Sequence, residues 1–263
     1  MRLDDYDAIL CDLDGCLISG DRVLPGARAL LAHAGERLII LSNNSTDTPA
    51  TLAARLAGIG LDAPPSRIVL AGTAALDLLA QEGDVRLCLY GSPALGDHAR
   101  ALGLTLERQT PSHVLLTRDE RFSYRDLQAC IGQLRRGARL LVANPDESHP
   151  GPGGDPVPET GSLLAAIRSV LPDLAYTVIG KPEPGLYRQA LARLPHAARR
   201  ILAIGDNPAT DGAGARRMGL DCALVGPRAE RYADLEAFLE EAVIRTAPRG
   251  LLAASQHDPR SLG

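Results

Sequence analysis

Short apolar runs alternate with longer segments of helical period along most of the chain. Nine runs of four or five residues have the composition of buried β-strands. The segments between them, such as residues 52–56 and 186–194, carry apolar residues three or four positions apart, which is the spacing of one helix face. This alternation predicts an α/β fold, in which parallel sheets are covered by helices on both faces. The predicted strands lie at residues 8–11, 37–41, 67–70, 86–90, 113–116, 140–143, 176–179, 201–204 and 222–225.

Three of these predicted strands continue directly into polar residues. The run at 8–11 is followed by Asp12 and Asp14, and the run at 201–204 by Asp206. Ser42 follows the run at 37–41. Ligands of open α/β sheets bind at the carboxyl ends of the strands, so these three strand ends are candidates for one shared site.

Asp12 and Asp14 are separated by a single residue. If the extended geometry of the strand persists, both carboxylates face the same side of the chain. Two such charges about 4 Å apart repel by roughly 4 kcal/mol at a protein-like dielectric, so the pair needs a cation or a shared proton. Mg²⁺ prefers oxygen ligands and is the natural counter-ion. The alternative is an ordinary turn or helix cap built from aspartate and Gly15.

Asp206 and Asp211 bring carboxylates to a second strand end. Asp206 is a candidate ligand of the same cation, and Asp211 is a candidate either to bind the cation or to brace the loop. The alternative is a helix N-terminus, where acidic residues and proline are favoured for structural reasons alone.

Ser42 and Lys181 complete a candidate phosphate site. A serine hydroxyl can hydrogen-bond a phosphoryl oxygen, and a lysine can neutralise charge on the nucleophile and on the transferring group. Lys181 is flanked by Gly180 and Pro182, which constrain the backbone around it. Taken singly, Ser42 is typical of a turn or helix cap and a lysine is typical of a solvated surface, so the prediction depends on the combination.

Composition narrows the range of partners. The net charge is −4 and no basic block is longer than a pair of arginines, which argues against nucleic acid as the principal partner. No apolar run approaches the roughly 20 residues that span a bilayer, and the N-terminal segment lacks the features of a signal peptide. We therefore expect a cytoplasmic protein. The five cysteines are odd in number and never spaced C-x-x-C, so neither a disulfide framework nor a zinc site is expected.

Four motifs, in this order, resemble those of the haloacid dehalogenase-like (HAD) hydrolase superfamily. The likeness is closest to its class IIA group, which includes the NagD-type and p-nitrophenyl phosphatases. The matching segments are residues 9–15 (ILCDLDG), 41–45 (LSNNS), 180–184 (GKPEP) and 205–211 (GDNPATD).

The resemblance implies a domain organisation. Residues 43–180 are 138 residues, too many for one crossover between strands, so a whole domain is expected inside this interval. The family pattern implies a Rossmann-like HAD core at residues 1–72 and 177–263 and an inserted α/β cap of the C2 type at 73–176. Residues 143–146 and 159–162 look like cap segments that face the active site. The Gly/Pro-rich residues 150–158 are expected to form a surface loop, and the segment from about 246 a loosely held tail.

The resemblance also implies roles for individual residues. Asp12 would be the nucleophile and Asp14 the general acid/base. Mg²⁺ would be held by Asp12, by the main-chain carbonyl of Asp14 and by Asp206, with Asp211 as a further candidate ligand. The residues that would hold the phosphoryl oxygens are Ser42, Asn43 and Lys181.

These inferences together predict a Mg²⁺-dependent phosphatase that hydrolyses small phosphate monoesters, such as sugar phosphates or nucleoside monophosphates, through an aspartyl-phosphate. The alternatives are a phosphomutase or phosphotransferase of the same superfamily, and a non-catalytic protein that binds a phosphorylated metabolite. A homodimer is expected by analogy alone. Cys16 stands beside the expected nucleophile, and if it is exposed its oxidation would inhibit the enzyme.

Overall fold

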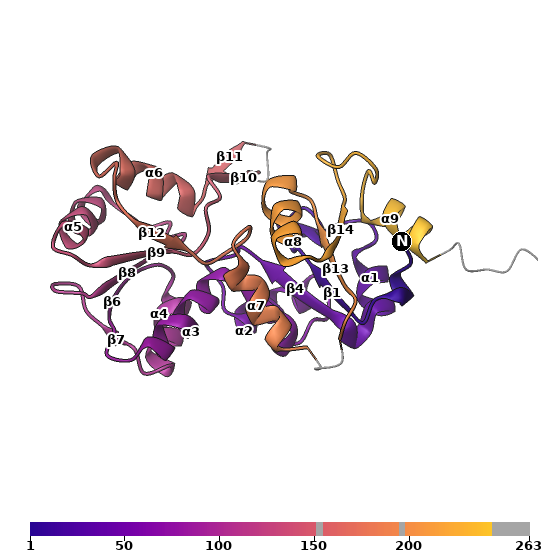
Figure 1. The fold of residues 1–263 in the computed structure, drawn as a ribbon, viewed down its shortest axis with the longest axis horizontal. Helices are drawn as coiled ribbons and strands as arrows, with labels where there is room; N and C mark the ends of the chain where they lie inside the picture. Colours follow the sequence, from indigo (N-terminus) through magenta and orange to yellow (C-terminus); the bar gives the residue numbers. More distant parts are fainter. Residues whose placement is uncertain (151–154, 195–197, 244–263) are drawn as a thin grey trace, which may run out of the picture.

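Two five-stranded parallel sheets form the framework of the protein (Figure 1). The computed structural model describes residues 1–150, 155–194 and 198–243. Helices pack on both faces of each sheet, which is the α/β architecture predicted from the alternation of apolar runs.

The first sheet carries the two ends of the described chain. All of its paired strands are parallel. Every residue of β1 and β4 is buried, because helices cover both faces and leave no side of these strands to water. The strand order is β14 (Asp221–Leu224), β13 (Ile201–Gly205), β1 (Ala8–Cys11), β4 (Leu38–Ser42) and β5 (Ile68–Leu70).

The two faces of the first sheet pack against different helices because side chains alternate along each strand. Ile9 and Cys11 belong to a core formed with α1 (Ala27–Ala34), α2 (Pro49–Gly58) and α9 (Leu235–Ala242). Leu10, between them, belongs to a second core formed with α3 (Ala71–Glu82) and α7 (Pro184–Ala192).

The second sheet is formed by the middle of the chain. Its strands are also all parallel. Helices α5 (Tyr124–Arg135) and α6 (Thr160–Val170) cover one face, and α3 and α4 (Pro93–Ala101) cover the other. The strand order is β12 (Tyr176–Val178), β9 (Arg139–Val142), β8 (His113–Leu116), β6 (Arg86–Tyr90) and β7 (Thr105–Leu106).

One apolar core extends from the first sheet to the second. It contains Leu10 and Leu41 of the first sheet together with Leu115 and Leu141 of the second. Helices α3 and α7 contribute to the same core, so the two sheets are packed into one body.

The remaining elements are short and do not belong to the two sheets. They are the hairpin β2 (Ile18–Ser19) and β3 (Arg22–Val23), the antiparallel pair β10 (Ser148–Pro150) and β11 (Pro156–Pro158), the helix α8 (Ala213–Met218), a π-helical turn at Pro208–Gly212, and 3₁₀ turns at Leu3–Asp5, Gly35–Arg37 and Pro65–Arg67.

Several details differ from the sequence prediction. Residues 148–150 pair with 156–158 in an antiparallel arrangement, so both ends of the segment at 150–158 are strand rather than loop. Proline cannot donate a hydrogen bond to a sheet, so a sequence this rich in proline does not indicate a strand. The predicted domain boundaries fall inside α3 and β12, and the division itself stays a prediction. The tail expected from about 246 lies outside the described residues.

Within the described ranges, no helix is both long enough and apolar enough to cross a membrane. The cytoplasmic location, the homodimer and the absence of a nucleic-acid partner stay predictions.

Candidate active site

The strand order places the predicted site residues at one edge of the first sheet. The neighbouring strands of this sheet are parallel, in the order β13, β1 and β4. Their carboxyl ends therefore lie side by side, with Asp206 directly after β13, Asp12 directly after β1 and Ser42 at the end of β4. Lys181 reaches this edge from the connection between β12 and α7. The structure thus brings the four sequence motifs together.

Lys181 is the centre of this arrangement. Its Nζ donates to Oδ1 of Asp12 at 2.7 Å and to Oδ1 of Asp211 at 2.6 Å. The lysine side chain is 3% exposed, and the two carboxylates are 11% and 4% exposed. A cation held by two acids with so little water cannot be the ordinary solvated lysine of a protein surface.

The charges of this buried trio support one another. Burial raises the pKa of Asp12 well above its usual value, while Lys181 acts in the opposite direction and Asp211 adds to the rise. Burial by itself would lower the pKa of Lys181, but the carboxylates of Asp12 and Asp211 outweigh it and raise that pKa well above its usual value. Lys181 is therefore the fixed positive charge of the site.

The backbone of Lys181 is held by Asn43. The Asn43 Oδ1 accepts from the Lys181 N–H at 2.7 Å, and the Asn43 Nδ2 donates to the Lys181 carbonyl at 3.1 Å. A Cβ at the preceding Gly180 would lie 2.5 Å from Asn43 Oδ1 and 2.7 Å from the carbonyl oxygen of Ala143, so only glycine permits this approach. The side chain of Asn43, predicted to bind phosphate, here positions Lys181.

Asp211 is fixed by the turn that contains it. Its N–H donates to the Asn207 carbonyl at 2.8 Å, and its Oδ2 accepts from the Asn207 N–H at 3.1 Å. A Cβ at Gly205 would collide with the Asp211 side chain, so the strand end must be glycine. Asp211 is hydrogen-bonded within its own loop and also pairs with Lys181, and its role as a ligand of the cation stays a prediction.

Asp12, Asp206 and Asp211 can supply oxygen ligands to one cation. Each offers a carboxylate oxygen, and these atoms lie within 4.8 Å of one another. Such an all-carboxylate set fits a hard divalent ion such as Mg²⁺. Asp206 is also paired with Arg228, whose Nη2 donates to Asp206 Oδ2 at 2.6 Å. Burial raises the pKa of Asp206, and Arg228 opposes the rise.

Asp14 lies apart from this set of carboxylates, with an exposed side chain. The surrounding protein nevertheless displaces water from it and raises its pKa, with Arg55 and His149 acting in the opposite direction. Gly15 follows with a φ of 85°, which turns the chain so that its N–H donates to the Ile18 carbonyl at 2.8 Å. The binding of Mg²⁺ by the main-chain carbonyl of Asp14 stays a prediction.

Ser42 is buried at the end of β4. Its Oγ accepts from the Asn44 N–H at 3.1 Å, which leaves the hydroxyl proton free to be donated. The structure therefore keeps this hydroxyl at the predicted edge, and its role toward phosphate stays a prediction.

Segments of the second sheet contact the site through Asn43 and Ser45. Asn43 Nδ2 donates to Asp146 Oδ2 at 2.9 Å, and Asn144 Nδ2 donates to the Asn43 carbonyl at 2.8 Å. Thr160 Oγ1 lies 3.2 Å from Ser45 Oγ. Residues 143–146 and 159–162 thus lie next to the site. The sequence analysis did not single out Ser45 as a contact residue, although Ser45 belongs to the matching segment 41–45 together with Ser42 and Asn43.

Arg228 was also missed by sequence reasoning. It lies in the loop after β14, and nothing in the local sequence distinguishes it from the other arginines of the chain.

The cysteine beside the predicted nucleophile lacks the exposure that the oxidation hypothesis requires. Cys16 is 1% exposed, and a hydrogen bond with Cys11 together with burial raises its pKa well above the usual value.

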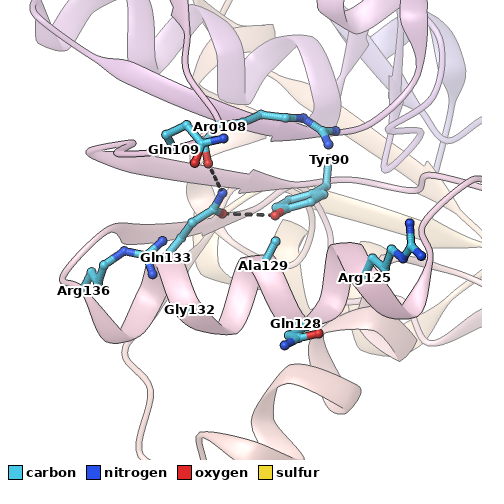
Figure 2. Close-up of a pocket in the computed structure, with 9 residues that line it drawn as sticks. All are labelled: Tyr90, Arg108, Gln109, Arg125, Gln128, Ala129, Gly132, Gln133 and Arg136. Atoms are coloured by element: carbon cyan, nitrogen blue, oxygen red, sulfur yellow. Dashed lines mark hydrogen bonds between the residues drawn. The ribbon is translucent and has the colours of Figure 1, made fainter.

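A separate pocket of about 520 Å³ lies beside α5, on the second sheet (Figure 2). Arg108, Arg125 and Arg136 surround it, and the Tyr90–Gln133 pair forms its inner wall. None of the predicted site residues lines it.

The sequence matches known hydrolases along much of its length. Residues 9–105 match the model of the haloacid dehalogenase-like hydrolases, and residues 178–246 match a HAD-hydrolase-like model. Dihydroxyacetone phosphatase of Corynebacterium glutamicum is 33% identical over 220 residues, which cover 82% of this chain and 79% of that protein.

Solved structures extend the likeness to the whole fold. Glycerol phosphate phosphatase from Mycobacterium tuberculosis in complex with magnesium has a TM-score of 0.79 at 29% identity, covering 88% of this chain and 76% of that one. NagD from E. coli K-12 has a TM-score of 0.76 at 27% identity, covering 86% and 88%. The chain therefore belongs to the haloacid dehalogenase-like hydrolases and, within them, to the NagD-like phosphatases, with a HAD core and a cap domain.

Proposed function

We propose that this protein is a Mg²⁺-dependent phosphatase that hydrolyses small phosphate monoesters through an aspartyl-phosphate formed on Asp12. The observation that carries the proposal is the buried Lys181, held between Asp12 and Asp211. A lysine in this position stabilises both the carboxylate that attacks and the phosphoryl group that arrives.

Asp12, Asp206 and Asp211 are the residues that would hold Mg²⁺, with the Asp14 carbonyl as a further ligand. The fit of three carboxylates supports this assignment, as does the magnesium complex of the related glycerol phosphate phosphatase. The cation supplies positive charge that reduces the repulsion between an anionic ester and an anionic nucleophile.

The first chemical step uses Asp12 and Asp14. Lys181 holds Oδ1 of Asp12, and a carboxylate oxygen of Asp12 attacks phosphorus while the bond from phosphorus to the leaving oxygen breaks. Asp14 gives its proton to the leaving alcohol. The raised pKa of Asp14 supports this role, because it enlarges the protonated fraction of the acid.

The second step reverses the proton transfer. Asp14, now a carboxylate, takes a proton from water, and the water oxygen attacks phosphorus. The bond from phosphorus to Asp12 breaks, which releases inorganic phosphate and restores the carboxylate. Ser42 and Lys181 would hold the phosphoryl oxygens in both steps, and residues 143–146 and 159–162 of the cap would border the leaving group.

The relatives suggest the size of the substrate. Their names refer to dihydroxyacetone, to glycerol phosphate and to ribonucleotide monophosphates. We propose a substrate of the same class, a small polyol or sugar phosphate or a nucleoside monophosphate.

The test is phosphate release from a panel of such esters, and from p-nitrophenyl phosphate, with Mg²⁺ and with EDTA. Wild-type protein should release phosphate only with the cation, and Asp12→Asn should lose activity by on the order of 10⁴-fold, because the amide is a poor nucleophile. Turnover that survives in Asp12→Asn would refute the assigned nucleophile. Tight binding of the esters without turnover would favour a binding protein, and transfer to a second alcohol a phosphotransferase.

A further inference from the structure

Every carboxylate of the candidate metal cluster already has a positive partner from the protein. Lys181 forms ion pairs with Asp12 and Asp211, and Arg228 forms one with Asp206. The three acids are therefore offset by two side-chain cations before any metal binds.

The two protein cations differ in how firmly they are held. Lys181 is 3% exposed and contacts two acids at once, whereas the side chain of Arg228 is 56% exposed and contacts one. A guanidinium at the surface can swing into water at little cost, because exposed ion pairs contribute only about 0–1 kcal/mol. A buried ammonium has no such alternative.

The loop that carries Arg228 is anchored beside Asp206. The Val225 N–H donates to the Gly205 carbonyl at 2.9 Å, and the Gly226 N–H donates to the Tyr232 carbonyl at 3.0 Å. Gly226 has a φ of 92°, and a Cβ there would lie 3.8 Å from the Asp206 Cβ. The backbone thus keeps Arg228 within reach of Asp206 while its side chain remains in solvent.

We propose that Arg228 is an exchangeable counter-ion of Asp206, which an incoming divalent cation displaces, so that this arginine sets the affinity of the metal site. The inference rests on the proposed function, since it assumes that Asp206 is a ligand. Arg228 keeps Asp206 neutralised while the metal is absent and raises the cation concentration at which the site fills.

The experiment is calorimetric titration of Mg²⁺ into wild type, Arg228→Gln and a matched control, Arg231→Gln. Arg231 lies in the same loop, is 64% exposed and pairs with Glu241 rather than with the cluster. We expect Arg228→Gln to bind Mg²⁺ about two- to fivefold more tightly, since an exposed ion pair of up to about 1 kcal/mol no longer competes. The control should match wild type, and added salt should shrink the difference.

Unchanged or weaker Mg²⁺ binding by Arg228→Gln would overturn the proposal, the weaker result meaning that Arg228 orients Asp206 for the metal. A fourth protein, Asp206→Asn, separates the two levels of inference. If it binds Mg²⁺ much more weakly than wild type while Arg228→Gln does not differ, the metal site stands and only the role of Arg228 fails. If it binds as well as wild type, both fail.

Discussion

The carboxyl ends of the two sheets meet around residues 43–46 but have different chemistry. At the first sheet these ends carry Asp12 and Asp206, which are charged and paired with cations. At the second sheet the contacts to Ser45 and Thr46 come from neutral donors, and one carboxylate, Asp146, accepts from Asn43. Ser92 Oγ donates to the Thr46 carbonyl at 2.5 Å, the Arg118 N–H to Ser45 Oγ at 3.0 Å, and Asn144 Nδ2 to Ser45 Oγ at 3.1 Å.

The same architecture therefore produces the acidic candidate site at one edge, whereas at the other edge Ser92, Arg118 and Asn144 connect the second sheet to residues 45 and 46, contacts that are called the joint below. Both sheets are parallel, five-stranded and covered by helices, so the fold does not distinguish them. The difference comes from the side chains that follow the strands, and function has to be argued from those side chains.

The pocket beside α5 gives a second contrast. Its Arg125 and Arg136 form no ion pair with any residue of the described chain, and both side chains are exposed to water. The buried Gln133 is satisfied internally, by Tyr90 Oη at 3.1 Å and by the Arg108 carbonyl at 2.7 Å (Figure 2). The charged groups of the candidate active site are buried and paired with one another, whereas the side chains of Arg125 and Arg136 are solvated.

The largest effect is expected at Lys181. Lys181→Met leaves two buried carboxylates without their counter-ion, so the free energy of unfolding should fall by about 3–5 kcal/mol and phosphatase activity by on the order of 10³-fold. Urea unfolding and phosphate release measure the two quantities.

Arg217→Met is the control for Lys181→Met, because Arg217 is 48% exposed and pairs with Glu183 outside the cluster. It should change neither quantity appreciably. Lys181→Arg keeps the charge but brings a larger planar group between two carboxylates, so it should lose activity with a smaller loss of stability. Full activity in Lys181→Arg would contradict the assigned geometry.

An intermediate effect is expected at the joint between the sheets. Asn144→Ala removes the donor to Asn43 and Ser45, and Gln133→Ala removes the partner of Tyr90, so each should lower the free energy of unfolding by about 1–3 kcal/mol. Only Asn144→Ala should also reduce kcat, because its neighbour Asn43 positions Lys181.

Asn144 and Gln133 are both buried, hydrogen-bonded amides, and they lie at different places in the molecule. Equal loss of kcat in both variants, after correction for the folded fraction, would remove the functional contrast between the joint and the outer pocket.

The smallest effect is expected at His113, at the end of β8 away from the site. Burial lowers its pKa, Arg139 adds to this and Glu82 opposes it. Below the usual histidine pKa of about 6.5 the unfolded chain therefore binds more protons than the folded protein, so stability should fall as the pH drops below that value.

His113→Gln should flatten this dependence between about pH 7 and pH 5, measured by urea unfolding, without a change in phosphatase activity. A slope that is the same in His113→Gln and wild type would assign it to other groups.

Much of the fold was predictable because the signals are local. β1, β6 and β8 have the predicted bounds, since strands of a parallel sheet that is covered on both faces are nearly continuous apolar runs. β2, β3 and β7 were not predicted, because strands of two residues carry too little pattern to recognise. β10 and β11 were not predicted, because their prolines are atypical of strands.

The site was predictable for a related reason. Asp12 and Asp206 each follow an apolar run, where a charged residue serves no packing purpose. Lys181, the single lysine of the chain, was predicted only from the combination of the ordered motifs, because a lysine by itself is typical of a solvated surface.

The sequence by itself determined the class of fold, the strands that carry chemistry and most of the charged groups of the site, because each follows from neighbouring residues. Only the tertiary structure decided that Lys181 lies between Asp12 and Asp211. The same holds for the ion pair of Arg228 with Asp206 and for the hydrogen bond by which Asn144 connects the second sheet to Ser45. These pairs are separated by 22 to 169 residues, and folding alone brings them into contact. The physical reason is that burial, which turns a weak surface attraction into a specific pairing, is a property of the packed molecule.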